Sequence, residues 1–301
     1  MQGAAFRCHS TSIPAWSLSG PPLANTTGTS ALCPSGLVRY LHFPKAASSF
    51  FTTVLAYSCA RVPFTTLELR VKASSQTTNI SAIQEASHQG NCPCLSGSVF
   101  RTYHHSALQV GDVLNAAGLF RHPAERLVSA FNFGMHAHGL KRQAAMRSAV
   151  RNTSNRSEQL RTFARWPGVA HVQTKMLLGH SPSSTYTPTA ADVELACSRV
   201  QSMKFVGVVS CFPESVALFK LQFPARHPDL PVHFRAGKSS GQHTSAARDL
   251  ELLLAGGYRD APDALVFCAA VSRLKALLRS HSNFHPSPDC LAAMQNGCTH
   301  A

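Results

Sequence analysis

Short runs of apolar residues alternate along the chain with longer segments of helical periodicity. The runs 37–43 (LVRYLHF) and 204–209 (KFVGVV) have the length and composition of buried strands, and Leu119-Phe120 ends a weaker third one. Helical spacing predicts helices over 50–60, 123–133, 190–200, 212–223 and 265–278, with further helical pieces over 140–180. Strands that alternate with helices indicate an α/β layer fold with a central parallel sheet flanked by helices.

Both ends of the chain lack this periodicity. Residues 1–36 are rich in Ser, Thr, Pro and Gly, which predicts a linker or stem. Residues 282–301 are expected to form a loose tail, and the polar segment 72–98 is expected to be a loop with one short helix at most. A chain of 301 residues is long enough for one large domain with an extensive core, which we expect over 37–281.

The composition is that of a globular protein with a strongly basic balance. Apolar residues make up 44% of the chain, and the formal net charge is +14. Such a charge favours an anionic partner, although a solvated basic surface would give the same balance. No block of five or six basic residues and no nucleic-acid-binding motif occurs, so nucleic acid is not expected as a partner.

Cysteines and glycosylation sequons point to an oxidising compartment. The chain has ten cysteines, and N-x-[ST] sequons begin at Asn25, Asn79, Asn152 and Asn155. Together they predict a disulfide-bonded glycoprotein of the Golgi lumen or secretory pathway, with a disulfide pairing that spacing alone does not give. Neither a transmembrane stretch nor a signal peptide stands out, so membrane association is expected only through a segment not visible in this chain.

The segment Leu37–Ala60 has the order strand, short loop, helix. Such a turn gathers backbone N–H groups and the positive end of the helix dipole at one point, which makes an anion site. Lys45 adds a mobile charge there, and Ser48 and Ser49 add hydroxyl donors. An ordinary βα turn with a surface lysine is the alternative interpretation.

A nucleotide kinase is the other enzyme class that an anion loop suggests. Its phosphate loop requires G-x-x-x-x-G-K-[ST]. The one Gly-Lys-Ser sequence is Gly237-Lys238-Ser239, and Val232 stands where the first glycine belongs. The pattern therefore argues against a nucleoside-triphosphate loop.

The segment Arg121–Phe131 (RHPAERLVSAF) is a second candidate anion site. Arg121 stands just before a predicted helix that has Pro at its first position, and Ser129 lies about two turns further on. Spacing of three and four residues predicts that Arg126, Ser129 and Phe133 share one stripe of this helix. The alternative is an amphipathic helix with a basic residue at its start.

The two segments together resemble the carbohydrate sulfotransferases. Pro44–Phe50 (PKAASSF) is similar to the family's 5′-phosphosulfate loop, P-K-[TA]-[GA]-[GS]-[TS]-[ST], and Arg121–Ser129 is similar to its 3′-phosphate motif, R-D-P-x-x-R-x-x-S. Gln173–Gly179 (QTKMLLG) resembles a further family segment, as does Phe205–Val208 followed by Phe212, Ser215 and Leu218. The similarity spans about residues 37–280 and is greatest to the Golgi membrane-type branch, such as heparan and dermatan sulfate 2-O-sulfotransferases.

This resemblance implies a P-loop-like three-layer fold and a reaction. A sulfuryl group would pass from 3′-phosphoadenosine 5′-phosphosulfate to a hydroxyl of an acceptor, expected to be an anionic glycan, without a metal. Lys45 would stabilise the bridging oxygen as adenosine 3′,5′-bisphosphate leaves, while Arg121 and Ser129 would hold the 3′-phosphate. The residues implied in holding the 5′-phosphosulfate are Lys45, Ala46, Ala47, Ser48, Ser49 and Phe50.

A base must take the proton of the acceptor, and histidine suits because its pKa lies near neutrality. The segment Arg101–Ser106 (RTYHHS) resembles the short histidine segment of the family. His105 is the expected base, with His104 as the substitute, and a surface or capping histidine is the alternative. Cys92-x-Cys94 near these histidines also suggests zinc, but its spacing is not that of a standard finger, and a disulfide is the favoured interpretation.

Four positions depart from the family pattern. Ala46 and Ala47 stand in the loop where one or two glycines are usual, His122 replaces an aspartate, and Ser210 replaces a glutamate. A side chain in the loop restricts how closely the backbone can approach the phosphosulfate. The alternative function is therefore a catalytically weakened sulfotransferase-fold protein that binds anionic glycans.

Overall fold

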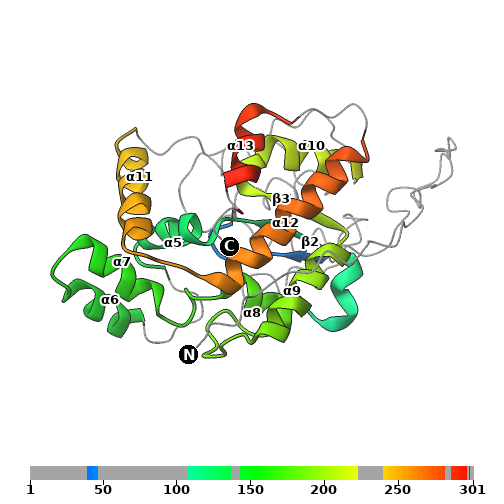
Figure 1. The fold of residues 1–301 in the computed structure, drawn as a ribbon. Coiled ribbons are helices and arrows are strands. Elements are labelled where there is room, and N and C mark those ends of the chain that lie inside the picture. The colour runs from blue at the N-terminus through cyan, green and yellow to red at the C-terminus, as the bar shows by residue number, and fades with distance from the viewer. Residues whose placement is uncertain are drawn as a thin grey trace, which may run out of the picture.

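The computed structural model describes residues 39–46, 107–136, 143–222, 240–281, 286–296 and 298. Within these residues, three short strands form one parallel sheet in the order β1-β2-β3: β1 (Arg39–Leu41), β2 (Ala116–Phe120) and β3 (Phe205–Val208). Tyr40 pairs with Ala117, which pairs with Phe205 on its other side. The expected α/β fold, with a parallel sheet flanked by helices, is confirmed (Figure 1).

Helices connect and cover the strands. In chain order they are η1 (Val110–Asn115), α5 (Pro123–Asn132), α6 (Gln143–Arg151), α7 (Arg156–Ala164), α8 (Val172–Leu178), α9 (Ala190–Ser202), η2 (Val209–Cys211), α10 (Phe212–Gln222), α11 (Ser240–Ala255), α12 (Ala261–Arg279) and α13 (Pro288–Asn296). The helices predicted over 123–133, 190–200, 212–223 and 265–278 are confirmed as α5, α9, α10 and α12. The predicted helix 50–60 and loop 72–98 lie outside the described residues.

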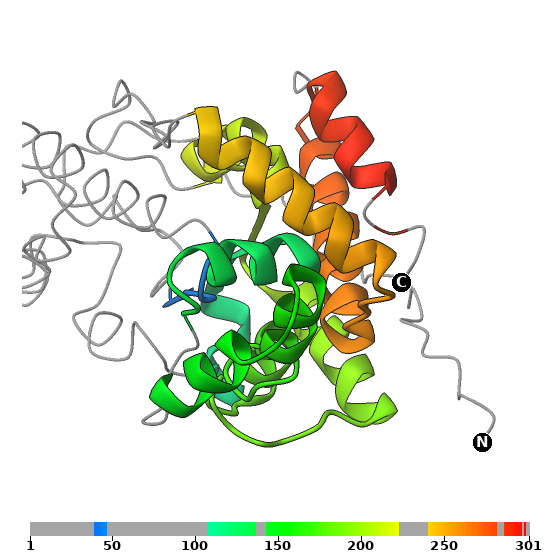
Figure 2. The same cartoon turned by 90° about the vertical axis from the view of Figure 1, so that its left-hand side faces the viewer.

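In the described part of the chain, the apolar core has two parts. One surrounds the sheet, where α12 packs against β3, α8, α9 and α10, and it includes Phe43, Phe120, Phe205 and Phe267. The other lies among α5, α6, α7 and α11, which Figure 2 shows grouped together, and it includes Leu127, Phe131, Met146, Phe163 and Leu253. None of the helices in the described part of the chain is both long and apolar enough to cross a membrane.

Gly207 allows β3 to approach β2 and α10 closely. A Cβ atom at this position would lie 2.6 Å from Leu119 Cδ1 and 2.9 Å from Ser215 Cβ, which no real structure accommodates without a shift. The Ser215 hydroxyl bonds back to β3, because it accepts from the Val208 N–H at 2.9 Å and donates to the Val208 carbonyl at 3.1 Å. Glycine in this strand therefore marks a close approach of two elements.

The stretch after Ser280 was expected to be loose, and the structure corrects this for its middle part. Helix α13 lies there, and the Cys211–Cys290 disulfide ties it to η2 across 79 residues. The disulfide supplies an anchor that the local apolar pattern does not reveal. A second disulfide joins Cys268 of α12 to Cys298.

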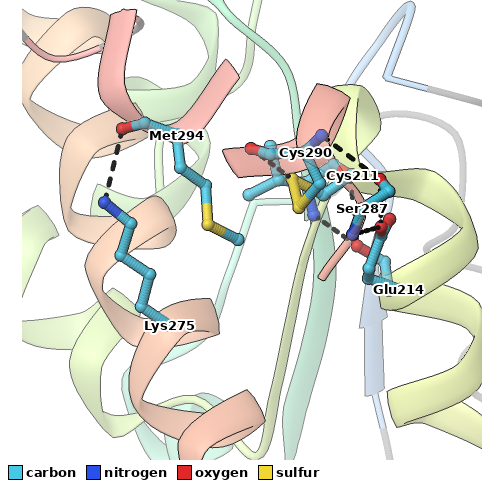
Figure 3. Close-up of a disulfide and its surroundings, with 8 residues drawn as sticks. Cys211, Glu214, Lys275, Ser287, Cys290 and Met294 are labelled. Carbon is cyan, nitrogen blue, oxygen red and sulfur yellow. Dashed lines mark hydrogen bonds between the residues drawn. A yellow bond between two sulfur atoms is a disulfide. The ribbon is translucent and has the colours of Figure 1, made fainter. Parts of the chain in front are cut away.

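Hydrogen bonds reinforce this attachment of α13 (Figure 3). One Glu214 carboxylate oxygen accepts from the Ser287 N–H at 2.9 Å and from its hydroxyl at 2.5 Å. On the other side of α13, the Lys275 ammonium donates to the Met294 carbonyl at 3.5 Å. The C-terminal helix is thus held both to the start of α10 and to α12.

Candidate active site

The two sequence motifs meet where β1 and β2 end. The chain leaves β1 through Pro44, Lys45 and Ala46, and it leaves β2 at Arg121. Because the strands are parallel neighbours, their carboxyl ends lie at the same edge of the sheet, where α/β proteins bind ligands. The Arg121 guanidinium donates from Nη1 to the Lys45 carbonyl at 3.2 Å, which brings together residues 76 positions apart.

Lys45 has an unusual backbone conformation. Its φ of 65° lies in the left-handed region, and the Ala46 N–H closes the turn by donating to the Phe43 carbonyl at 3.1 Å. For a residue with a side chain this conformation costs about 1–2 kcal/mol, and such strain is concentrated at functional sites. The Lys45 ammonium lies 3.7 Å from the centre of the Phe133 ring, which is 41% exposed at the end of α5.

Arg121 retains capacity to bind an anion. Its Nε donates to Glu125 at 3.4 Å and its Nη1 to Lys45, and the side chain is 25% exposed. Within the described residues, Nη2 of the guanidinium has no partner, although it carries two of the five N–H donors. Burial lowers the pKa of Arg121 and Glu125 opposes that shift, so the group remains a cation at neutral pH.

Ser129 and His122 lie on and before α5, respectively. The Ser129 side chain is half-buried, and in the described part of the chain its hydroxyl makes no hydrogen bond within the protein. His122 does not cap the helix with its side chain but packs edge-on against Phe267, with ring centres 5.4 Å apart. Burial lowers the pKa of His122, so this replacement for the family's aspartate is a neutral packing group at pH 7.

Arg126 is buried, although the stripe predicted for it also contains the half-buried Ser129 and the exposed Phe133. Its side chain is 1% exposed, pairs with Asp263 of α12 at 3.6 Å and donates to the Val169 carbonyl. Helical spacing defines the neighbours of Arg126 on the helix but not what packs against its side chain. Leu127, Ala130 and Phe131, which the same spacing predicts to face a core, are buried.

A buried polar centre links α5, α8 and α12. Asp263 accepts from the Gln173 N–H at 3.1 Å, and from the Thr174 N–H and hydroxyl, both at 2.8 Å. It therefore caps α8 from outside, where His171 provides no side-chain cap. Burial and the nearby charge of Asp260 raise the pKa of Asp263, while Arg126 and Thr174 oppose the shift.

The second pair in this centre joins His171 to Asp260. The His171 Nδ1 lies 2.7 Å from an Asp260 oxygen, and the His171 N–H donates to the same carboxylate at 3.0 Å. Burial alone would lower the pKa of His171, but the hydrogen bond and charge of Asp260 outweigh it and raise the pKa. Burial alone would raise the pKa of Asp260, yet the hydrogen bond from His171 holds it below its usual value.

The structure describes part of the predicted site. Lys45, Ala46, Arg121 and Ser129 are placed, and the first three lie at one edge of the sheet. The remaining predicted residues, Ala47, Ser48, Ser49, Phe50, His104 and His105, lie outside the described residues, as do Cys92 and Cys94. Sequence analysis missed Asp263, which a helix-start signal in Asp260-Ala261-Pro262-Asp263 could have indicated.

One group of side chains within the described ranges has the proximity that a metal ion requires. The ligand atoms of Cys211, Glu214 and Cys290 all lie within 4.8 Å of one another. Both sulfurs are joined in the disulfide, so neither is a thiolate, which is the form of cysteine that binds metal. The group lies where α13 meets η2 and α10, and its contacts there are structural (Figure 3).

The fold and the two motifs define an α/β protein with a basic site at the carboxyl ends of its strands. A family model described as "Sulfotransferase family" matches residues 31–215, more than half of the 301 residues, and the chain therefore belongs to the sulfotransferase family. The match covers β1, β2 and β3 with both motifs, and it identifies the protein as a transferase of sulfuryl groups. No curated protein and no solved structure matches the chain.

Proposed function

We propose that the protein transfers a sulfuryl group from 3′-phosphoadenosine 5′-phosphosulfate to a hydroxyl of an anionic glycan, as heparan and dermatan sulfate 2-O-sulfotransferases do. Membership of the sulfotransferase family supports the reaction class. The observation that carries the choice of donor is the hydrogen bond from Arg121 to the Lys45 carbonyl at 3.2 Å. It joins the proposed 5′-phosphosulfate loop to the proposed 3′-phosphate motif, so one nucleotide carrying both groups can contact both.

The residues at this edge of the sheet suit a ligand with two anionic ends. Nη2 of Arg121 and the hydroxyl of Ser129 offer donors for a 3′-phosphate. Lys45 supplies a compact charge for the 5′ end, and the loop that continues through Ser48 and Ser49 supplies further donors in this proposal. Arg121 and Ser129 thereby distinguish the donor from ATP, which has no 3′-phosphate.

In the proposed reaction the chain orients two oxygens on opposite sides of sulfur. The acceptor oxygen forms a bond to sulfur as the bond from sulfur to the bridging oxygen breaks, and adenosine 3′,5′-bisphosphate leaves. Lys45 neutralises the charge that develops on the bridging oxygen, and His105, or His104 in its place, takes the acceptor proton. Positioning and charge stabilisation supply the rate enhancement, and the scheme uses no metal.

An anionic acceptor and a secretory location are supported by bulk properties. The formal net charge of +14 favours association with sulfated or carboxylated polymers. Disulfides at Cys211–Cys290 and Cys268–Cys298 are typical of proteins that fold in an oxidising compartment. We therefore place the protein in the Golgi lumen or elsewhere in the secretory pathway.

Transfer of radioactive sulfate to a panel of glycans tests the proposal. We expect transfer to heparan or dermatan sulfate precursors, with a loss of about 10²- to 10³-fold in Lys45→Ala, because a charge that stabilises the transition state is removed. His105→Ala should lose about 10²- to 10⁴-fold. Lys275→Ala is the matched control, since the Lys275 ammonium contacts the Met294 carbonyl in another part of the molecule and should leave transfer unchanged.

Binding of adenosine 3′,5′-bisphosphate separates the alternatives. Micromolar binding is expected, and its absence would overturn the proposed enzyme. Retained binding to sulfated glycans would then favour the catalytically weakened glycan-binding protein. Tighter binding of ATP than of the 3′-phosphorylated nucleotide would instead favour a nucleotide kinase.

A further inference from the structure

The side-chain amide of Gln173 bonds to both backbone groups of Arg121. The Arg121 N–H donates to Gln173 Oε1 at 3.0 Å, and Gln173 Nε2 donates to the Arg121 carbonyl at 3.0 Å. Gln173 lies in the first turn of α8, 52 residues away in sequence, and is fully buried. A buried amide that satisfies both polar groups of one residue is a specific clamp rather than an incidental contact.

This clamp stands where the sheet stops. β2 is the central strand, and its last registered pair joins Phe120 to Val208. Arg121 follows directly, and among the described residues no strand pairs with its backbone, just where the chain turns into α5. A primary amide offers the same donor and acceptor as a peptide group. The side chain of Gln173 therefore makes with the Arg121 backbone the pair of hydrogen bonds that a neighbouring strand would make.

Gln173 is itself held in place. Its own N–H donates to Asp263 Oδ2 at 3.1 Å, and Asp263 is fully buried and paired with Arg126 at 3.6 Å. Arg126 belongs to the same helix that begins two residues after Arg121. The clamp is therefore part of a closed network that fixes α8 relative to both the end of β2 and α5.

We infer that Gln173 is a positioning residue for the donor site, which sets the backbone at Arg121 so that its guanidinium faces the Lys45 carbonyl and the 3′-phosphate of the donor. The inference rests on the role proposed for Arg121 above. The guanidinium of an arginine lies several bonds from the backbone. A small rotation of the backbone at Arg121 would therefore move the guanidinium away from both the Lys45 carbonyl and the 3′-phosphate. Sites of this kind depend on supporting contacts that hold their geometry to within about 0.5 Å.

The test compares two nucleotides that differ only in the 3′-phosphate. Dissociation constants for adenosine 3′,5′-bisphosphate and adenosine 5′-monophosphate are measured for the wild type and for Gln173→Leu, which keeps the volume and removes both hydrogen bonds. We expect the preference for the bisphosphate to fall by about tenfold in Gln173→Leu, while binding of the monophosphate changes little. If Gln173 had a purely structural role, the substitution would weaken the binding of both nucleotides alike and leave the ratio of their dissociation constants unchanged.

Gln201→Leu is the matched control. The Gln201 amide donates to the Ala269 carbonyl at 2.9 Å, between α9 and α12, and does not contact Arg121. This variant should keep the wild-type ratio of the two dissociation constants. A ratio that falls equally in Gln201→Leu would overturn the inference.

A second variant tests the clamp while keeping one of its two hydrogen bonds. In Gln173→Glu an ionised carboxylate still accepts from the Arg121 N–H but cannot donate to its carbonyl, whereas the protonated acid can do both. The nucleotide preference, relative to the wild type at each pH, should therefore recover as the pH is lowered and the acid is protonated. Gln173→Leu should show no such recovery, and Gln173→Glu also decides the matter if the leucine variant fails to fold.

The outcomes separate this inference from the proposed function. If the wild type does not prefer the bisphosphate, the proposed function fails and the inference fails with it. If the wild type prefers it and both Gln173 variants keep that preference at every pH, the donor assignment stands and Gln173 is not a positioning residue.

Discussion

Two arginines of one motif, five residues apart, lie in opposite surroundings. Arg121 is 25% exposed at the edge of the sheet, and part of its guanidinium has no partner in the described structure. Arg126 is 1% exposed, pairs with the fully buried Asp263 and donates to the Val169 carbonyl. The first has donors left for the ligand proposed above, whereas the second holds α5 to α12 and to the segment before α8.

The difference shows that a sequence motif can combine two physical tasks. An anion site needs a cation with unsatisfied donors, and such a cation must remain near solvent. Its position must also be fixed, which requires buried contacts that a partly exposed side chain cannot supply. Arg126 supplies such contacts within the same helix that Arg121 precedes.

Replacing Arg126 should give the largest effect. Arg126→Met leaves Asp263 as an unpaired buried carboxylate, and we expect the free energy of unfolding to fall by about 3–5 kcal/mol. Urea denaturation followed by circular dichroism measures it. Arg121→Met is the internal comparison and should cost less than about 1 kcal/mol, because its pair with Glu125 is partly exposed. Equal losses in the two variants would contradict the division of tasks.

Replacing Arg121 should have the complementary effect on binding. Arg121→Met removes charged hydrogen bonds to the proposed 3′-phosphate, so the affinity for adenosine 3′,5′-bisphosphate should fall by roughly 10- to 100-fold. Affinity for adenosine 5′-monophosphate should change far less. Titration calorimetry with both nucleotides checks the expectation. An unchanged affinity for the bisphosphate would remove Arg121 from the donor site.

The smallest expected effect is a pH dependence of stability in the polar centre. In the folded protein the pKa of His171 is raised and that of Asp260 is lowered. Their pair therefore adds most to the free energy of unfolding between the pKa values of the two groups in the unfolded chain, about 4 for Asp and about 6.5 for His. The contribution is lost as the pH rises through the folded pKa of His171, or falls through that of Asp260.

His171→Asn isolates this pair. Asparagine tolerates the left-handed φ of 54° at this position but does not titrate. The stability difference between the wild type and this variant should be greatest near pH 6 and shrink toward pH 8.5, as measured by urea denaturation at several pH values. A difference that grows with pH would show that the pair is not the source.

Local signals predicted the elements around the site well. Pro123 at the first helical position and the apolar spacing of Leu127, Ala130 and Phe131 predicted α5, and β-branched residues predicted β3. The strand-turn arrangement placed Lys45 at the end of β1. These features depend on neighbours in sequence, which a pattern can show.

Contacts between distant segments could not be predicted in the same way. Helical spacing put Arg126 on one stripe with Ser129 and Phe133, but it could not show that Asp263, 137 positions later, pairs with Arg126 in the interior. Nothing local indicates that Cys211 pairs with Cys290, which attaches the short helix around Cys290 to η2. The clamp by Gln173 likewise requires the sheet and α8 to be assembled first.

Asp263 belongs to α12. It accepts hydrogen bonds from the first turn of α8 and forms an ion pair with Arg126 of α5. One carboxylate at the junction of three helices makes the segments around 126, 173 and 263 dependent on one another in evolution. A relative that replaces Asp263 should also change Arg126, and it should begin α8 with a capping residue of its own. Substitution at these positions is therefore expected to be correlated.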